Sequence, residues 1–114
     1  MSVKIQKRKI IVYETISGER PFELWIDKIK DLKNRSRILK RIAQAGEGNW
    51  GDYKAVENSL IELRMFFKSS PGFRAYIGID GNKLLVLLLG GDKGSQQKDI
   101  DRAKSYWIDY LESK

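Results

Sequence analysis

The sequence contains no cysteine and no histidine. These two absences exclude a disulfide framework, a zinc site built from the usual ligands, a thiol nucleophile and an imidazole base. Any acid–base chemistry must then come from lysine, arginine, tyrosine or carboxylate side chains. Proline is also scarce, with 2 residues in a chain of 114, and the composition is that of a folded protein and not of a disordered one.

Long apolar runs are missing as well. The longest one, at residues 84–89, has the length of a strand and falls far short of the roughly 18 to 20 residues that cross a bilayer. The basic start of the chain lacks the apolar stretch and the cleavage site of a signal peptide. We therefore expect one cytoplasmic domain over residues 1–114, with no membrane partner.

Positive charge exceeds negative charge. The chain has 22 Lys and Arg against 15 Asp and Glu, which gives a net charge of +7. The excess is concentrated in residues 1–10, 28–41 and 64–83. A basic protein with clustered charge favours a polyanionic partner such as nucleic acid.

Hydrophobic periodicity predicts an α+β fold in the order β-α-α-β-β-β-α. The two consecutive helices form a predicted hairpin, the second with Asn34 or Ser36 as its N-cap. The sheet is small and mainly antiparallel, its last strand is interior and covered on both faces, and the C-terminal helix packs on it. The predicted ranges are strand 4–15, helices 21–32 and 34–46, loop 46–59, strands 61–67, 73–80 and 83–89, and helix 97–112.

Four side chains of the predicted hairpin share one face of the sheet. Pairing residue 67 with residue 73 places Arg64 opposite Tyr76 and Phe66 opposite Arg74. Lys93 then follows the last strand at the end where Arg74 lies. Basic side chains beside aromatic rings are typical of an RNA-binding surface. Two simpler interpretations stay open, in which Arg64 is solvated or pairs with Glu62 or Asp80, and the aromatic rings only pack.

The sequence does not predict a metal or cofactor site. Asp52, Asp80 and Asp92 have no spacing typical of a carboxylate metal centre. The run Gly90-Gly91-Asp92 lacks the lysine and hydroxyl spacing of a nucleotide-binding loop. We therefore expect no metal ligands and no cofactor.

Five short motifs follow one another along nearly the whole chain: Pro21-Phe22 with Trp25, residues 48–54, Glu62-Leu63-Arg64, residues 71–76, and Gly90-Gly91-Asp92-Lys93 with the later Ala103 and Trp107. In this order they resemble the addiction-module killer proteins of the RelE/ParE superfamily, in its HigB-like, phage-related branch. These proteins are the toxins of type II toxin–antitoxin pairs. The resemblance implies a RelE-like fold.

The resemblance also implies an activity, the cleavage of mRNA on the translating ribosome. Such cleavage needs no metal, because the ribose 2′-hydroxyl attacks the adjacent phosphate while the protein supplies a base, an acid and positive charge. The matching basic residues here are Arg74, Arg64, Lys54 and Lys93. The histidines and late tyrosine that act in some relatives are absent from this sequence.

We assign hypothetical roles to these four residues. Arg74, with Arg64 beside it, holds the scissile phosphate through its guanidinium fork. Lys54 is the candidate base, helped by neighbouring positive charge, and Lys93 stabilises the leaving oxygen. Further RNA contacts are predicted for the aromatic residues Phe66 and Tyr76 and for the basic helix residues Arg35, Arg37, Lys40 and Arg41.

The expected partners follow from the same resemblance. They are the ribosome with its mRNA and a cognate antitoxin, commonly with a helix-turn-helix domain, through which the complex would bind operator DNA. Two alternatives stay open: a ParE-like toxin that poisons DNA gyrase, and an inactive module that only binds RNA or the antitoxin. The arginine cluster favours an RNA target over gyrase.

Overall fold

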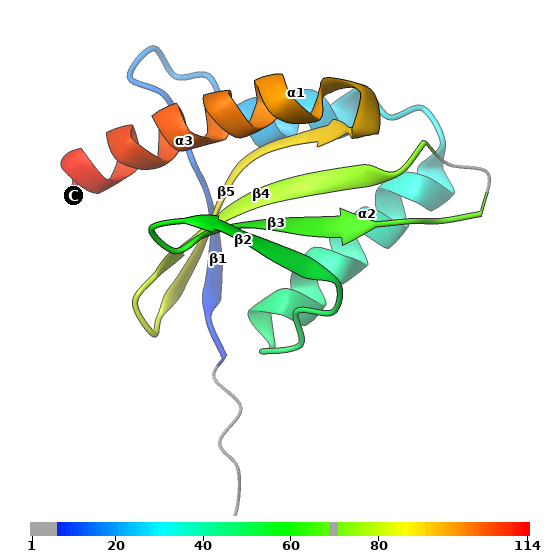
Figure 1. The fold of residues 1–114 in the computed structure, drawn as a ribbon, viewed down its shortest axis with the longest axis horizontal. Helices are drawn as coiled ribbons and strands as arrows, with labels where there is room; N and C mark the ends of the chain where they lie inside the picture. Colours follow the sequence, from blue (N-terminus) through cyan, green and yellow to red (C-terminus); the bar gives the residue numbers. More distant parts are fainter. Residues whose placement is uncertain (1–6, 69–70) are drawn as a thin grey trace, which may run out of the picture.

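The protein folds around a mixed sheet with the strand order β1-β5-β4-β3-β2. This computed structural model describes residues 7–68 and 71–114, and Figure 1 shows the sheet between its helices. In chain order the elements are β1 (Lys9–Val12), α1 (Pro21–Asp27), α2 (Leu32–Gly46), β2 (Tyr53–Glu57), β3 (Leu60–Met65), β4 (Phe73–Asp80), β5 (Leu84–Asp92), the short 3₁₀ helix η1 (Lys93–Ser95) and α3 (Gln96–Glu112).

Strand β5 is interior, as the sequence predicted. It pairs with β1 in parallel and with β4 in antiparallel orientation. Its side chains from Leu85 to Leu89 are buried and alternate between the two faces of the sheet as far as Leu88; Leu89 lies on the same face as Leu88, where the pairing with β4 is irregular. The remaining pairs, β4 with β3 and β3 with β2, are antiparallel. The predicted α+β class and the mainly antiparallel sheet are thereby confirmed. Residues 4–6 of the predicted first strand lie outside the described residues.

Helices α1 and α2 cover one face of the sheet. Phe22 and Ile26 from α1 and Ile38 from α2 are buried in one cluster with sheet residues such as Leu63 and Ile77. The buried residues of α1 and α2 recur at the helical spacing that predicted these helices. Both helices therefore lie over the same core.

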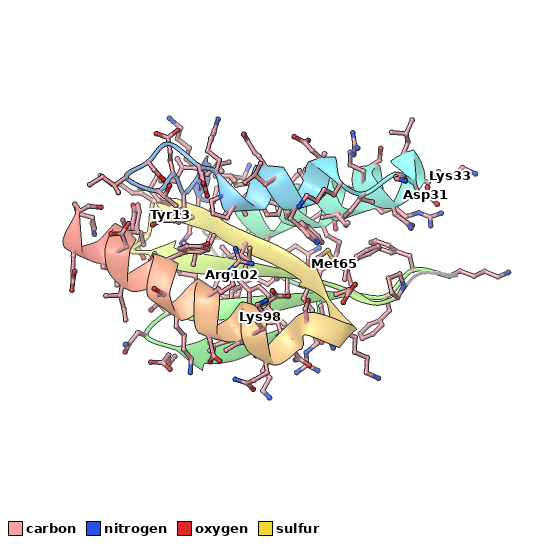
Figure 2. The ribbon with its side chains drawn as sticks, turned by 90° about the horizontal axis from the view of Figure 1, so that it is seen from above. Tyr13, Asp31, Lys33, Met65, Lys98 and Arg102 are labelled. Carbon is pink, nitrogen blue, oxygen red and sulfur yellow. The ribbon has the colours of Figure 1, made fainter. Side chains whose placement is uncertain are left out.

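Helix α3 covers the opposite face. Ala103 and Trp107 pack there against Tyr76 and Leu88, so the molecule has three layers, as the view from above in Figure 2 shows. The indole N–H of Trp107 donates a hydrogen bond of 2.8 Å to the Asn58 carbonyl. In the part of the chain that is described, no helix is long and apolar enough to cross a membrane.

The structure differs from the prediction at the helix ends. α1 stops at Asp27, and Leu32, the last residue of the predicted first helix, begins α2 with 68% of its surface exposed. The N-cap is Asp31, whose carboxylate accepts hydrogen bonds of 2.9 and 3.3 Å from two backbone N–H groups of the first turn. Asp31 satisfies donors that a helix leaves unpaired. Asn34 and Ser36 are therefore not caps.

The predicted loop at residues 46–59 contains a strand, β2. This strand has one neighbour, β3, and only Val56 of its side chains is partly buried. With so little burial, its sequence carries no apolar alternation that would predict a strand. Asn58 and Ser59 have positive φ angles of 48° and 66° and form the turn into β3.

Two glycines allow tryptophans to touch the sheet. A Cβ atom on Gly78 of β4 would lie 2.2 Å from the ring of Trp107 on α3. A Cβ atom on Gly90 of β5 would lie 2.0 Å from the ring of Trp25 on α1. The helices on both faces therefore approach the sheet through positions without a side chain.

We predict that Gly78→Ala destabilises the protein. The added methyl group must displace the Trp107 ring, and overpacking of this kind costs about 1 to 3 kcal/mol. The free energy of unfolding, measured by urea titration, is expected to fall by that amount. Ser105→Ala on the exposed side of α3 serves as the control with little change. Equal stability of the wild type and Gly78→Ala would show that Trp107 does not pack on Gly78.

Candidate functional site

Two rows of side chains lie on the α3 face of the sheet. Lys54 of β2, Glu62 of β3 and Tyr76 of β4 are directly paired neighbours across three strands. In the next row, Arg64 of β3 pairs with Arg74 of β4. Because side chains alternate along a strand, all five point to the same face. The predicted grouping of Arg64, Arg74 and Tyr76 on one face is confirmed, and Glu62 lies among them.

The carboxylate of Glu62 is the centre of this cluster, with 1% of the residue exposed. Its Oε2 accepts hydrogen bonds of 3.1 Å from the Tyr76 hydroxyl and 3.1 Å from Nε2 of Gln96, at the start of α3. Its Oε1 lies 3.4 Å from Nε of Arg64 and 3.8 Å from Nε of Arg74. One buried carboxylate thus faces two arginines. The contact of Arg64 with Glu62, one of the simpler interpretations, is confirmed.

Arg74 is the most unusual side chain of the cluster. Only 6% of it is exposed, and its Nε and Nη1 have no hydrogen-bond partner among the described residues. Nε of Arg64 is buried and lacks such a partner too. Buried donors are nearly always satisfied, and a guanidinium fork suits an anion with several oxygens. The cluster can therefore bind a phosphate group.

Two glycines shape the surroundings of Arg74. Gly91 of β5 is paired with it, and a Cβ atom there would lie 1.9 Å from Oδ2 of the buried Asp99 on α3. Gly72, with a φ of 79°, lies under the ring of Phe66. That ring is 64% exposed and 6.0 Å from Cζ of Arg74. Phe66 therefore stacks on the buried arginine and is accessible for stacking on a base.

Tyr76 does not fit its predicted role. Its ring is fully buried beneath α3, so it has no surface on which RNA could stack. Burial, together with the charge of Glu62 and the hydrogen bond to it, raises the pKa of the Tyr76 hydroxyl. The phenol therefore stays protonated near neutral pH and donates to Glu62. Tyr76 is a support of the cluster.

The two predicted lysines lie at the edges of the cluster. Lys54 is exposed on β2, opposite Glu62, in a strand and not in the loop that we predicted. Lys93 is exposed in η1, and its backbone N–H donates a hydrogen bond of 3.1 Å to the Gly72 carbonyl, next to the strand that carries Arg74. The fold thus brings Lys93 to the same end of the sheet as Arg74, as predicted.

The basic residues of α2 are not part of this cluster, because α2 lies on the opposite face. Arg35 donates to the carbonyls of residue 27, the last of α1, and residue 29 in the following loop. Arg41 donates to the carbonyls of residues 50, 52 and 64. Cζ of Arg37 lies 5.7 Å from the centre of the Phe67 ring, and Lys40 is exposed. The guanidinium groups of Arg35 and Arg41 are therefore engaged in holding loops, which leaves Arg37 and Lys40 better placed for RNA.

A separate hollow of about 290 Å³ lies between α1 and α3. Trp25 lines it from α1, Arg102 and Tyr106 line it from α3, and Gly90 and Gly91 of β5 form part of its wall. Figure 2 looks toward this side of the molecule and labels Arg102. Neither Arg64 nor Arg74 lines this hollow.

The sequence indicated Glu62 only as a possible partner of Arg64, and it gave no indication of Gln96. Glu62 precedes Arg64 by two residues, and this spacing already places the two on one face. Gln96 reaches Glu62 from α3, 34 residues later in the chain, and no local pattern indicates that contact.

Two comparisons with known proteins bear on the family. No family model matches the chain. An uncharacterized protein of Haemophilus influenzae is 40% identical over 83 residues, which cover 73% of this chain and 82% of that protein.

We predict that Glu62→Gln destabilises the fold. The amide leaves the buried charge of Arg74 without a carboxylate opposite its Nε, and breaking a buried ion pair costs about 3 kcal/mol or more. The free energy of unfolding in urea should fall accordingly, and the double variant Glu62→Gln/Arg74→Met should recover part of the loss. Glu57→Gln, which breaks the exposed pair with Lys104, is the control with a far smaller effect. A neutral Glu62→Gln would contradict the central place of this carboxylate.

Proposed function

The chain belongs to the same family as this Haemophilus influenzae protein, and we propose that it is a type II toxin that stops translation by cutting mRNA on the ribosome. One observation carries the proposal: Nε and Nη1 of the buried Arg74 have no hydrogen-bond partner among the described residues, and Arg64 and Lys54 lie on the same face. Phosphate is the chemical group that such a fork recognises best in RNA.

The fold supports this proposal. A five-stranded mixed sheet with two helices on one face and one on the other is compatible with the RelE-like fold that the sequence motifs imply. The observed order contains one strand more than the order we predicted, namely β2. This addition favours the proposal, because β2 carries Lys54 to the arginine cluster.

The proposed reaction is an internal transfer at phosphorus. The 2′-oxygen forms a bond to the adjacent phosphorus, the bond from phosphorus to the 5′-oxygen breaks, and a cyclic phosphate and a free 5′-hydroxyl result. Arg74 and Arg64 bind the non-bridging oxygens, where negative charge accumulates in the transition state. Lys54 accepts the proton of the 2′-hydroxyl, and Lys93 supplies a proton to the 5′-oxygen. No metal or cofactor takes part in this scheme.

Other residues supply binding and support. The exposed ring of Phe66 offers a stacking surface for a base next to the scissile phosphate. Arg37 and Lys40 on α2 add salt-dependent attraction to the RNA backbone. Glu62 and Tyr76 keep the arginines in place from below the surface. The roles are thus divided between the groups that touch RNA and the buried Glu62 and Tyr76, which hold the arginines.

The proposed biological setting follows from the activity. A toxin of this class acts in the cytoplasm on ribosomes that carry mRNA. Its cognate antitoxin, with a helix-turn-helix domain, would neutralise it, and the complex would bind operator DNA through the antitoxin.

We predict that Arg74→Met abolishes cleavage. Removing a positive group that stabilises the transition state lowers the rate by about 100-fold or more. Primer extension on mRNA from a purified translation reaction, with and without ribosomes, measures the cuts. Arg64→Met, at a partly exposed position, should also lose most activity and serves as a second variant if Arg74→Met folds poorly. Arg102→Met, which removes an equal charge from α3, should cut as the wild type does.

Three results would contradict the proposal. One is cleavage by Arg74→Met and Arg64→Met at the wild-type rate, and the second is a complete absence of cuts by the wild-type protein. The third is growth arrest with DNA damage and ongoing translation, which would indicate gyrase as the target.

A further inference from the structure

Arg41 of α2 makes an unusual set of contacts. Its Nη1 donates a hydrogen bond of 2.7 Å to the carbonyl of Trp50, and its Nη2 donates to the carbonyls of Asp52, at 3.0 Å, and Arg64, at 3.2 Å. One guanidinium thus joins a helix to two segments of backbone. The first segment leads into β2, and the second is the end of β3.

The backbone of Arg64 is held on both sides by this network. Its N–H donates a hydrogen bond of 2.9 Å to the Asp52 carbonyl, and its own carbonyl accepts from Arg41. The Asp52 carbonyl accepts two hydrogen bonds, one from the Arg64 N–H and one from Nη2 of Arg41. The position of Arg64 relative to the start of β2, and hence relative to Lys54, therefore depends on contacts made from the far face of the sheet.

The loop before β2 is shaped around the same guanidinium. Gly51 has a φ of 62°, and a Cβ atom on it would lie 2.8 Å from Nη1 of Arg41. Burial lowers the pKa of Arg41, and the negative charge of Asp52 opposes this effect. Arg41 is thus embedded between the helix and the loop and is not a solvated helix residue.

β2 needs such a support more than the other strands. Among the described residues it is an edge strand that pairs with β3 alone, and its pairing is irregular between Ala55 and Glu57. At its far end, Lys104 of α3 contacts Glu57 at 2.9 Å. At the other end of β2, Arg41 holds the preceding loop through hydrogen bonds to the carbonyls of Trp50 and Asp52.

We propose that Arg41 is a positioning residue for RNA cleavage, which fixes Arg64 and the strand of Lys54 so that both reach one phosphate. This inference rests on the proposed nuclease function. It assigns Arg41 a role different from the direct RNA contact predicted from its charge. Small displacements of catalytic groups are costly, since a shift of about 1 Å can lower a rate by about 100-fold.

The test is ribosome-dependent cleavage under multiple-turnover conditions, with kcat and KM measured separately. Arg41→Met is expected to lower kcat by about 10-fold to 100-fold and to change KM by less than about threefold, because Arg64 stays in the site but is misplaced. Arg41→Lys should give an intermediate kcat, since one ammonium group replaces a planar fork that reaches three carbonyls. Gly51→Ala should lower kcat in the same way by displacing the guanidinium.

The matched control is Lys104→Met. It removes one positive charge and releases the opposite end of the same strand, and we expect it to keep the wild-type kcat and KM. Urea titration of every variant at the assay temperature checks that each of them is folded. If Arg41→Met does not fold, Arg41→Lys and Gly51→Ala decide the question.

The outcomes separate this inference from the proposed function. Active wild-type protein with Arg41 variants within about twofold of its kcat would overturn the positioning role alone. An equal loss in Lys104→Met would also overturn it, because general loosening of β2 would then explain the effect. A wild-type protein that makes no cuts would overturn the proposed function and, with it, this inference.

Discussion

The contact on which the candidate site depends is the buried carboxylate of Glu62 between two arginines. It accepts hydrogen bonds from Tyr76 and Gln96 and faces the Nε atoms of Arg64 and Arg74. Burying arginines in a sheet is unfavourable without a counter-charge. The two guanidinium groups share this carboxylate, and Nη1 of Arg74 has no hydrogen-bond partner among the described residues. Donors without a hydrogen bond are suited to an anion.

The three layers of the fold each contribute to this arrangement. The sheet sets the spacing of the two arginines through the pairing of β3 with β4. From one face, α3 supplies Gln96 and approaches the sheet where Gly78 and Gly91 have no side chain. From the other face, α2 holds the ends of β2 and β3 through Arg41. The surface that carries Arg64, Arg74, Lys54 and Lys93 therefore depends on contacts throughout the molecule.

Sequence reasoning predicted what depends on local pattern. Alternation over residues 61–67 placed Arg64 and Arg74 on one face, which is correct. The predicted pairing was wrong by two residues, because Met65 pairs with Phe73 and both phenylalanines after Met65 belong to the turn. A shift of two residues preserves the face, whereas a shift of one would have reversed it. The sequence did not predict β2, because this strand depends on its pairing with β3. It did not predict the contact of Glu62 with Gln96, because Gln96 lies on a helix distant in the chain.

An NMR titration of the arginine Nε–H signals with inorganic phosphate tests most directly whether this cluster is an anion site. The buried Nε of Arg74 and of Arg64, which face Glu62 without a hydrogen bond, should shift together and saturate, since a phosphate bound by the two guanidinium groups changes the surroundings of both. The signal of Arg102, which donates to Tyr106 on the surface of α3, should stay nearly constant. Equal shifts at all arginines, or none at Arg74, would contradict a phosphate site on this face of the sheet.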